Sequence, residues 1–518
     1  MRACSPTRLA TGVLLCFILV AVGAHFLHLE ADFPRGVTWS RVLYTDEGWY
    51  SGGAVARATT GRWHVEGDLN VMVGMPVLHL VQGAVFNVAG MSLGSARATI
   101  VCFFVAMLPL AYLLVSRHTN TLGGLVAVAL LSGSFIVFAY SRLAIADLPA
   151  ASLVLLSLVL AAHPGRRFGL VTSGLSGLVF GVAILTKTTV LAGLPALLYA
   201  AWTSGESSRQ RAAGCATAAA VAAGVVSMYF CAARWLYAPD VRYFATFHRA
   251  QRFEPHPLYA LRNLWPTVRL WARVDRIMSP LALALVPVFF AASRRFRRNR
   301  AAAISLVWLV GHVLMVSAST YQPPRYLVSA VIPAAMVLGV MAGVLARKPE
   351  RVKPLLIVLA VGLLVFADAG RMVRYVRSPS YTFVSMARDV ATHMSSRPGE
   401  SPYLLGNFAN SISLATGVRS INDMHGTRDL EWKLAEYQPS YYVKLGRGGK
   451  ITGLITAMHG LELIAAYDVY ASFRDPDPEE VYFYAIAEKA PSDSAQSGRG
   501  ARPARAGRSR VHSPSPGR

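Results

Sequence analysis

Two adjacent carboxylates, Asp46 and Glu47, stand in the stretch YTDEGWYSGG, shortly after the first apolar segment of the chain. A carboxylate held at the boundary between water and lipid can accept a proton from a hydroxyl or amine while that group attacks a carbon atom. A neighbouring carboxylate can raise the proton affinity of its partner or orient the incoming group. The same residues also suit the first turn of a helix. The acidic pair could therefore provide a general base, or it could cap a helix.

Cationic side chains recur beside later apolar segments. Arg142 and Asp147 lie in SRLAIADLP, Lys187 lies in ILTKTT, and Arg325 lies in YQPPRYL. Arginine and lysine bind phosphate groups, and arginine does so through two parallel hydrogen bonds. Each cation could equally anchor a helix at the lipid headgroups, and Asp147 alone could cap a helix.

A further cationic group lies at 239–257, where His248 and Arg252 stand among aromatic residues. Such mixtures commonly anchor helices at a membrane interface. A lipid phosphate or pyrophosphate would also explain this density of arginine.

The stretch HVEGD places His64, Glu66 and Asp68 at alternate positions, which share one face of an extended backbone. This trio is a candidate for binding a divalent metal ion, although no open-site pattern supports it. The five cysteines form no CxxC pair, so neither a zinc site nor a disulfide framework is indicated.

The composition is typical of a membrane protein. The 518 residues are 54% hydrophobic and only 15% charged, whereas soluble domains carry about 25% charged residues. A net charge of +24 would suggest a nucleic-acid partner for a soluble chain, but the excess arginine lies in short clusters between apolar segments. Such clusters mark cytoplasmic loops, so we expect a multi-pass protein of the cell (inner) membrane with no nucleic-acid partner.

About eleven segments have a length and composition suited to crossing a bilayer, which takes roughly 17–25 apolar residues, although two are short. We expect spans at 9–29, 95–115, 122–140, 147–163, 168–187, 188–203, 211–233, 278–293, 302–319, 326–346 and 354–371. The first span could instead be a signal peptide. The stretch 71–90 is interrupted by Pro76, His79 and Gln82, and we interpret it as a juxtamembrane helix.

A cytoplasmic N-terminus puts every short basic cluster between spans on one side, as the positive-inside rule requires. These clusters are Arg117–His118, 166–167, Arg209 with Arg211, 294–300 and 346–353. The loops 30–94 and 234–277 then lie outside, together with the candidate residues. Ionisable groups near mid-span, which would favour a transporter, are not evident.

The character of the chain changes near residue 372. One helical face in 381–394 and strand-like segments at 403–406, 440–445, 462–473 and 480–487 predict a small extracytoplasmic α/β domain over 372–490. Residues 491–518 are rich in Ser, Gly, Pro and Arg and are expected to be a disordered basic tail. The predicted fold is thus a mainly helical membrane domain, 1–371, followed by this domain.

Between residues 9 and 335 these segments resemble, in order, the GT-C-type membrane glycosyltransferases. The similarity is greatest to the bacterial, family 39-like branch related to protein O-mannosyltransferases and the lipid A aminoarabinose transferase. It rests on YTDEGWYSGGAVARATTGRW, GMSLGSARATIVCFF with Arg97, SRLAIADLPAASL, GLVFGVAILTKTTVLAGLP, YFATFHRAQRF and PRYLVSAVIP. The stretch VGMPVLHL departs from the family, which often has paired prolines before the juxtamembrane helix.

The resemblance implies transfer of a hexosyl or pentosyl group, with inversion, from a polyprenyl-phosphate donor to a protein, lipid or glycan acceptor at the outer membrane face. Asp46 would be the general base and Glu47 its positioning partner. The implied substrate-binding residues are Tyr50, Arg97, Arg142, Asp147, Lys187, His248, Arg252 and Arg325. No nucleotide cofactor is expected, and a divalent metal is left open. A lipid-linked sugar flippase and a non-catalytic scaffold that presents residues 372–490 are the alternatives.

Overall fold

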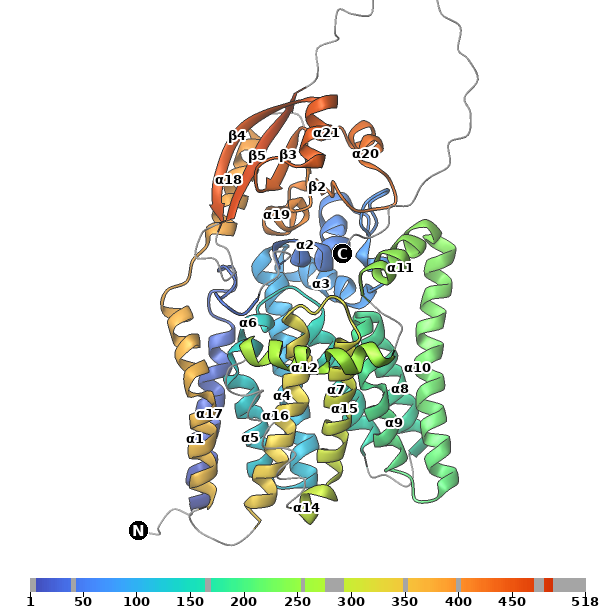
Figure 1. Ribbon diagram of the computed structural model, residues 1–518, viewed down its shortest axis with the longest axis vertical. Coiled ribbons are helices and arrows are strands. Elements are labelled where there is room, and N and C mark those ends of the chain that lie inside the picture. Colours follow the sequence, from blue (N-terminus) through green and yellow to red (C-terminus); the bar gives the residue numbers. More distant parts are fainter. Residues whose placement is uncertain are drawn as a thin grey trace, which may run out of the picture.

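The computed structural model describes residues 6–38, 43–163, 169–252, 257–274, 293–347, 353–396, 402–469 and 479–487. A bundle of long helices, with the N-terminus at one end, carries a smaller α/β domain at its opposite end (Figure 1). The predicted span 278–293, the basic pair 166–167 and the tail 491–518 lie outside the described residues.

The bundle contains most of the predicted spans as helices. Its members are α1 (Pro6–His25), α4 (Leu93–His118), α5 (Thr121–Gly133), α6 (Phe135–Ser141), α7 (Asp147–Ala161), α8 (Gly169–Thr186), η2 (Thr188–Gly193), α9 (Leu194–Trp202), α10 (Ser208–Leu236), α15 (Arg300–Ser317), α16 (Arg325–Leu345) and α17 (Lys353–Arg377).

The expected polytopic helical membrane protein is confirmed. Of the described helices, seven are long and apolar enough to cross a membrane, or eight if the bent pair α5 and α6 is one span. The predicted spans at 147–163 and 188–203 are shorter helices in the structure, and the number eleven stays a prediction.

Helix α16 lies at the centre of the bundle, and nearly all its residues are buried. It approaches α5 closely through glycines, since a Cβ added to Gly339 would lie 2.6 Å from the carbonyl oxygen of Gly123. Small residues allow such close packing where lipid provides no hydrophobic drive between helices. Asn120 reinforces the contact, because its side-chain amide donates to the carbonyl of Gly343 at 2.9 Å.

The break between α5 and α6 is a bend of 64°. The freed backbone N–H of Phe135 donates to a carboxylate oxygen of Asp368, on α17, at 3.0 Å. Asp368 also forms an ion pair with Arg371 at 3.6 Å. This ionisable residue inside a predicted span therefore caps a broken helix.

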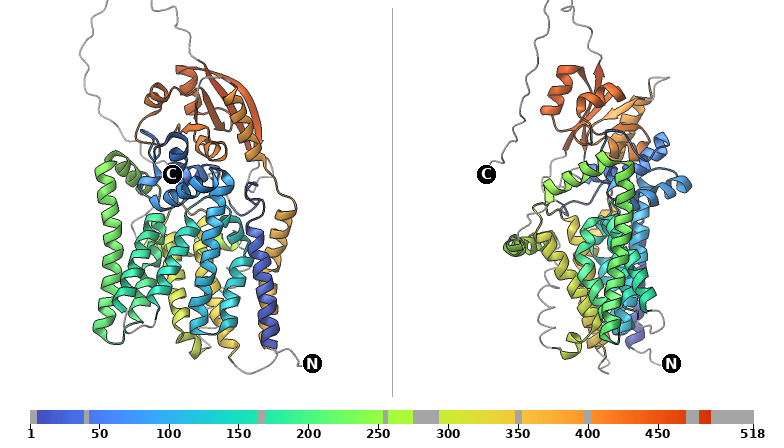
Figure 2. Two further views of the ribbon diagram at one scale, coloured as in Figure 1. Left: turned by 180° about the vertical axis from the view of Figure 1, so that it is seen from behind. Right: turned by 90° about the vertical axis from the view of Figure 1, so that its right-hand side faces the viewer.

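Several short helices cover the end of the bundle that faces the α/β domain. They are α2 (Leu43–Thr60), η1 (Val71–Val73), α3 (Pro76–Ala89) and α11 (Ala238–Arg252). Helix α3, with only 14 residues, agrees with the interpretation of 71–90 as less than a full span. Helix α12 (Pro257–Val274) crosses the front of the bundle at a steep angle to its helices (Figures 1 and 2).

The α/β domain contains the five-stranded sheet β2-β1-β3-β5-β4. Strands β1 (Tyr403–Leu405), β2 (Arg419–Ile421) and β3 (Tyr441–Leu445) are parallel, whereas β4 (Gly460–Val469) and β5 (Glu479–Ala487) are antiparallel to their neighbours. Its helices are α18 (Thr382–Ser395), α19 (Ala409–Thr416), α20 (Leu430–Tyr437) and α21 (Lys450–Met458). Four strands match the predicted segments, and β2 was not predicted.

The basic clusters that the structure describes gather at the end of the bundle away from the α/β domain. The short helix α14 (Arg294–Arg297) lies there (Figure 1). The carbonyl of His118 accepts hydrogen bonds from Asn299 at 2.8 Å and from Arg347 at 3.2 Å, which brings three clusters together. This arrangement is the one expected from the charge pattern, while the compartments on the two sides stay a prediction.

Candidate active site

The acidic pair lies near the start of α2, with Asp46 in its first turn, at the junction between the bundle and the α/β domain. Asp46 and Glu47 are only 4% and 2% exposed. The next residue, Gly48, donates its N–H to Ser411 Oγ of α19 at 3.1 Å, and a Cβ at Gly48 would overlap the Ser411 backbone. The glycine therefore lets the α/β domain dock directly against the acidic turn.

Glu47 is held by Arg97 of α4 in a two-pronged ion pair. The Nε–Oε1 and Nη2–Oε2 distances are 2.7 and 2.6 Å. The Ala144 N–H also donates to Oε1 at 2.8 Å. The remaining Arg97 nitrogen donates to the carbonyls of Leu29 and Ala31, both at 2.7 Å. Arg97 thus ties α2 to two other segments, and a substrate phosphate would have to compete with these partners.

Asp46 forms a buried ion pair with Arg325, the first residue of α16. The guanidinium of Arg325 lies 5.8 Å from the ring centroids of both Tyr321 and Tyr326. Within the described residues, Arg325 Nε is buried and has no hydrogen-bond partner. One donor of this arginine is therefore available to a ligand that enters the site.

Lys187 and Asp147 form a third buried ion pair, with Nζ 2.5 Å from Oδ2. Lys187 follows the end of α8 and is 2% exposed. Its ammonium lies 5.4 Å from the ring centroid of Tyr50 and 5.2 Å from that of Tyr326. Tyr326 therefore contacts both Lys187 and Arg325, so the two cations lie against the same aromatic side chain.

Arg142 makes mainly backbone contacts. It donates to the carbonyls of Ala24, His25 and His28 at 3.3, 3.0 and 2.5 Å, which satisfies carbonyls at the C-terminal end of α1. Its guanidinium carbon lies 4.9 Å from the ring centroid of Phe138. Arg142 therefore stabilises the C-terminal end of α1.

The three candidate metal ligands, His64, Glu66 and Asp68, contact different partners. His64 Nε2 lies 3.2 Å from Asp240 Oδ2, Asp68 accepts from the N–H of Asn422, and the exposed Glu66 meets Tyr437 only through its backbone carbonyl. No three His, Cys, Asp or Glu side chains in the described ranges gather in a metal-binding arrangement. The side chains of His248 and Arg252, on α11, lie outside the described part of the chain.

His79 and Gln82, from the stretch 71–90, are also buried near α2. His79 accepts a hydrogen bond from the Gly53 N–H at 3.2 Å, while its Nε2 and the amide of Gln82 have no partner among the described residues. Trp49 Nε1 and Ser51 Oγ on α2 are likewise buried and unpaired there. An unpaired buried polar group costs about 1–3 kcal/mol, so this face can gain from a polar ligand or from water.

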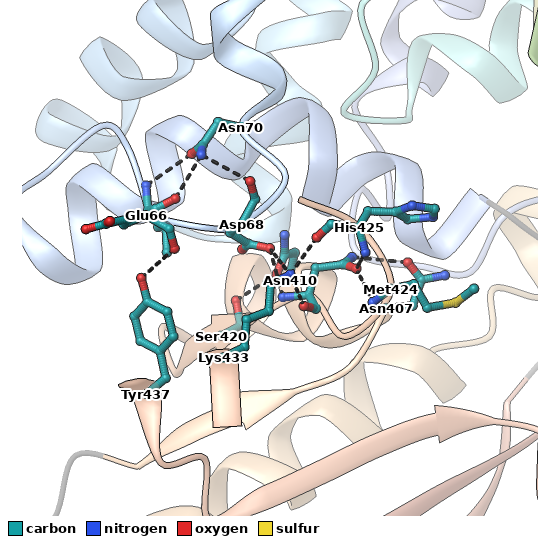
Figure 3. Close-up of polar contacts among 12 residues, drawn as sticks. Glu66, Asp68, Asn70, Asn407, Asn410, Ser420, Met424, His425, Lys433 and Tyr437 are labelled. Atoms are coloured by element: carbon teal, nitrogen blue, oxygen red, sulfur yellow. Dashed lines mark hydrogen bonds and ion pairs between the residues drawn. The ribbon is translucent and has the colours of Figure 1, made fainter. Parts of the chain in front are cut away.

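A polar cluster between the loop that follows α2 and the α/β domain was not foreseen (Figure 3). Lys433 is 1% exposed, donates to the carbonyls of Asn422 and His425 at 2.6 Å, and lies 3.7 Å from Asp68. Burial raises the pKa of Asp68 and lowers that of Lys433, because both charges have lost water. Since 365 positions separate these two residues, no local pattern could indicate their pairing.

Comparison with known proteins supports the resemblance seen in the sequence. Residues 74–230 match the family model described as dolichyl-phosphate-mannose-protein mannosyltransferase. No curated protein matches the chain.

Two solved structures of ArnT from Cupriavidus metallidurans have the same fold. The apo form has a TM-score of 0.64 at 15% identity and covers 92% of this chain and 98% of its own. The form bound to undecaprenyl phosphate has a TM-score of 0.63 at 15% identity, with 91% and 98% covered. The family-model match over residues 74–230 and the fold shared with ArnT both agree with the resemblance of the sequence to GT-C-type membrane glycosyltransferases.

Proposed function

We propose that the chain transfers a sugar from a polyprenyl-phosphate donor to an acceptor hydroxyl or amine at the bundle end that carries the α/β domain. The observation behind this proposal is the convergence of three buried ion pairs at that end: Asp46–Arg325, Glu47–Arg97 and Lys187–Asp147. The similar ArnT structure with bound undecaprenyl phosphate suggests the lipid carrier. We assign this end to the outside of the cell (inner) membrane.

In the proposed reaction, the acceptor oxygen or nitrogen attacks the anomeric carbon and gives its proton to Asp46. The bond from that carbon to the phosphate oxygen breaks, with inversion, and the lipid phosphate leaves as an anion. Arg325 and Lys187 stabilise the charge that develops on the leaving group. Both cations are paired with carboxylates before the donor binds, so the phosphate exchanges places with Asp46 on Arg325 and frees that carboxylate to act as base.

Glu47, Arg97 and Arg142 are positioning residues in this proposal. Glu47 and Arg97 fix the first turn of α2, which carries Asp46. Arg142 fixes the end of α1 through three backbone carbonyls. Tyr50 and Tyr326 form the wall against which Lys187 lies.

The structure favours this reaction over the two alternatives. A scaffold would leave Asp46, Lys187 and Arg325 dispersed, whereas Lys187 and Arg325 both lie within 6 Å of the Tyr326 ring centroid, at 5.2 and 5.8 Å. A flippase would use ionisable groups within the spans. Asp368, which is such a group, is engaged by the Phe135 N–H and by Arg371.

The test is the Asp46→Asn variant of the full chain in lipid nanodiscs. Release of polyprenyl phosphate from synthetic polyprenyl-phosphate hexoses and pentoses, with cell-envelope extract as acceptor, is followed by mass spectrometry. We expect turnover to fall by about 100- to 10,000-fold, the contribution typical of a general base. Asp429→Asn is the control, because the side-chain oxygen of asparagine can accept the same capping hydrogen bond that Asp429 accepts from the Trp432 N–H of α20.

Ion-pair exchange also predicts the affinity for the product lipid. In Asp46→Asn, undecaprenyl phosphate no longer competes with a carboxylate for Arg325, so the variant should bind this lipid more tightly than the wild type although it turns over less. Unchanged turnover in Asp46→Asn would show that Asp46 is not the general base. Weaker binding of undecaprenyl phosphate by the variant would refute the exchange.

A further inference from the structure

A pocket lies between the loop after α2, the start of α11 and the α/β domain. Its volume is about 820 Å³, and Arg62, Trp63, Glu66, Tyr237, Asp240 and Arg428 contribute to its lining. Between Asp46 and Thr60 helix α2 rises by about 21 Å, at 1.5 Å per residue. Arg62 follows this helix, and none of the six residues of the three ion pairs lines the pocket.

The walls of the pocket are fixed by hydrogen bonds between the segments that form it. Asp240, in the first turn of α11, lies 3.2 Å from His64 Nε2 and accepts from the Asn70 amide at 2.8 Å. The His64 ring stacks on Tyr237 with centroids 4.8 Å apart. On the other side, the N–H of Arg428 donates to the Gly67 carbonyl at 3.2 Å. The pocket is therefore preorganised.

The lining combines aromatic rings with both signs of charge. Trp63 and Tyr237 are partly exposed and provide ring surfaces. Arg62 and Arg428 are matched by Glu66 and Asp240, so the four charges cancel. A polyanion would meet two carboxylates there, and an apolar ligand would cover these charged groups without offering them a hydrogen bond. A polyhydroxylated ligand suits this set, because hydroxyls both donate to carboxylates and accept from arginine, while the C–H face of a sugar ring packs on an aromatic face.

One loop of the α/β domain links this pocket to the acidic turn. The His425 ring lies 5.4 Å from the ring of Trp49, which follows Asp46 and Glu47 on α2. Two residues further on, Thr427 and then Arg428 line the pocket. An extended ligand several sugar units long could follow this loop from one place to the other.

We propose that the pocket binds neutral sugar units of the acceptor, away from the acceptor atom that reacts at Asp46. The assignment of this ligand to the acceptor rests on the proposed glycosyl transfer. Binding of a neutral oligosaccharide to the pocket does not, and it can be measured without any donor.

The experiment titrates the full chain in lipid nanodiscs with neutral trisaccharides of glucose, mannose, galactose and arabinose, and follows binding by saturation-transfer NMR. We expect binding by at least one trisaccharide, and the Arg62→Ala and Glu66→Gln variants should each weaken it about tenfold, the effect of losing one charged hydrogen bond. Arg234→Ala and Glu436→Gln are matched controls, because these exposed residues do not line the pocket. The controls should bind like the wild type.

Three results would overturn the inference: no trisaccharide binds, the pocket variants bind as the wild type does, or a phosphorylated oligosaccharide or a peptide competes better than every neutral sugar. Asp46→Asn distinguishes this inference from the proposed function. It should abolish transfer and leave trisaccharide binding intact. If the wild type binds a trisaccharide through Arg62 and Glu66 but transfers no sugar, the proposed function fails and the pocket assignment stands.

Discussion

Replacement of Glu47 by glutamine separates a positioning role of this residue from a chemical one. Glu47 is 2% exposed and accepts two hydrogen bonds from Arg97 and one from the Ala144 N–H. Glutamine keeps the shape of the side chain but removes its negative charge. It also turns an amide N–H group towards donors that need an acceptor, and so leaves the buried guanidinium without a counter-charge.

We expect Glu47→Gln to lower the free energy of unfolding by about 3–5 kcal/mol, the range for a buried ion pair that loses one partner. The double variant Glu47→Leu/Arg97→Met should recover part of this loss, since apolar residues often replace a buried ion pair at little cost. Arg97 also donates to the carbonyls of Leu29 and Ala31. At about 1 kcal/mol for each of these two hydrogen bonds and for the one that Glu47 accepts from the Ala144 N–H, the double variant should remain about 3 kcal/mol below the wild type.

Unfolding by SDS in mild detergent, followed by tryptophan fluorescence, gives the free energy for each variant, and release of polyprenyl phosphate gives its turnover. A positioning role predicts that the double variant regains stability and part of the turnover together. The reasoning is refuted if Glu47→Gln is as stable as the wild type but inactive, because Glu47 would then take part in the chemistry itself.

Three further predictions concern the junction between the two domains. Gly48→Ala should destabilise the chain and lower turnover, because its Cβ would overlap Ser411; Gly52→Ala, on the same helix with open space around it, should gain up to about 1 kcal/mol in SDS unfolding. Burial raises the pKa of Asp423 to about 6. Between about pH 4 and 6 the folded state therefore binds more protons than the unfolded state. The contribution of Asp423 to the free energy of unfolding should fall by about 3 kcal/mol as the pH rises through this window. Asp423→Asn should remove this pH dependence. Lys433→Met should leave Asp68 buried without its cation and speed hydrogen exchange in α20, and Asp68→Asn/Lys433→Met should slow it again.

The sequence correctly indicated features that depend only on where a residue lies along its helix. Lys187 and Arg325 flank apolar segments, and the alternation of basic loops puts both at the same end of the bundle. Their common contact with Tyr326 agrees with that expectation. Spacing along the chain could not show which carboxylate pairs with which cation, because the partners of a buried ion pair depend on how α2, α7, α8 and α16 pack together.

Features that depend on contacts between distant segments were not predictable. The bend between α5 and α6 falls in an apolar run without proline, and its freed N–H is satisfied by Asp368, which is 233 positions away. The pairing of Asp68 with Lys433 likewise joins the loop after α2 to the α/β domain. Amphipathic helices and strands can be recognised by the regular spacing of their apolar residues. No such spacing links two residues that are hundreds of positions apart.

The charges at the junction offer a physical reason for using paired cations. Four buried cations, Arg97, Arg142, Lys187 and Arg325, accompany four buried carboxylates, Asp32, Asp46, Glu47 and Asp147, so the charges of these residues cancel. A sugar linked to a lipid through a phosphodiester would bring one negative charge to this site. In the proposed reaction the lipid phosphate leaves with close to two negative charges at neutral pH, and the proton taken up by Asp46 removes one carboxylate charge. The donor and product complexes would therefore have the same net charge, so the reaction would add no unbalanced charge to the buried site, where such a charge is costly because the dielectric constant is low.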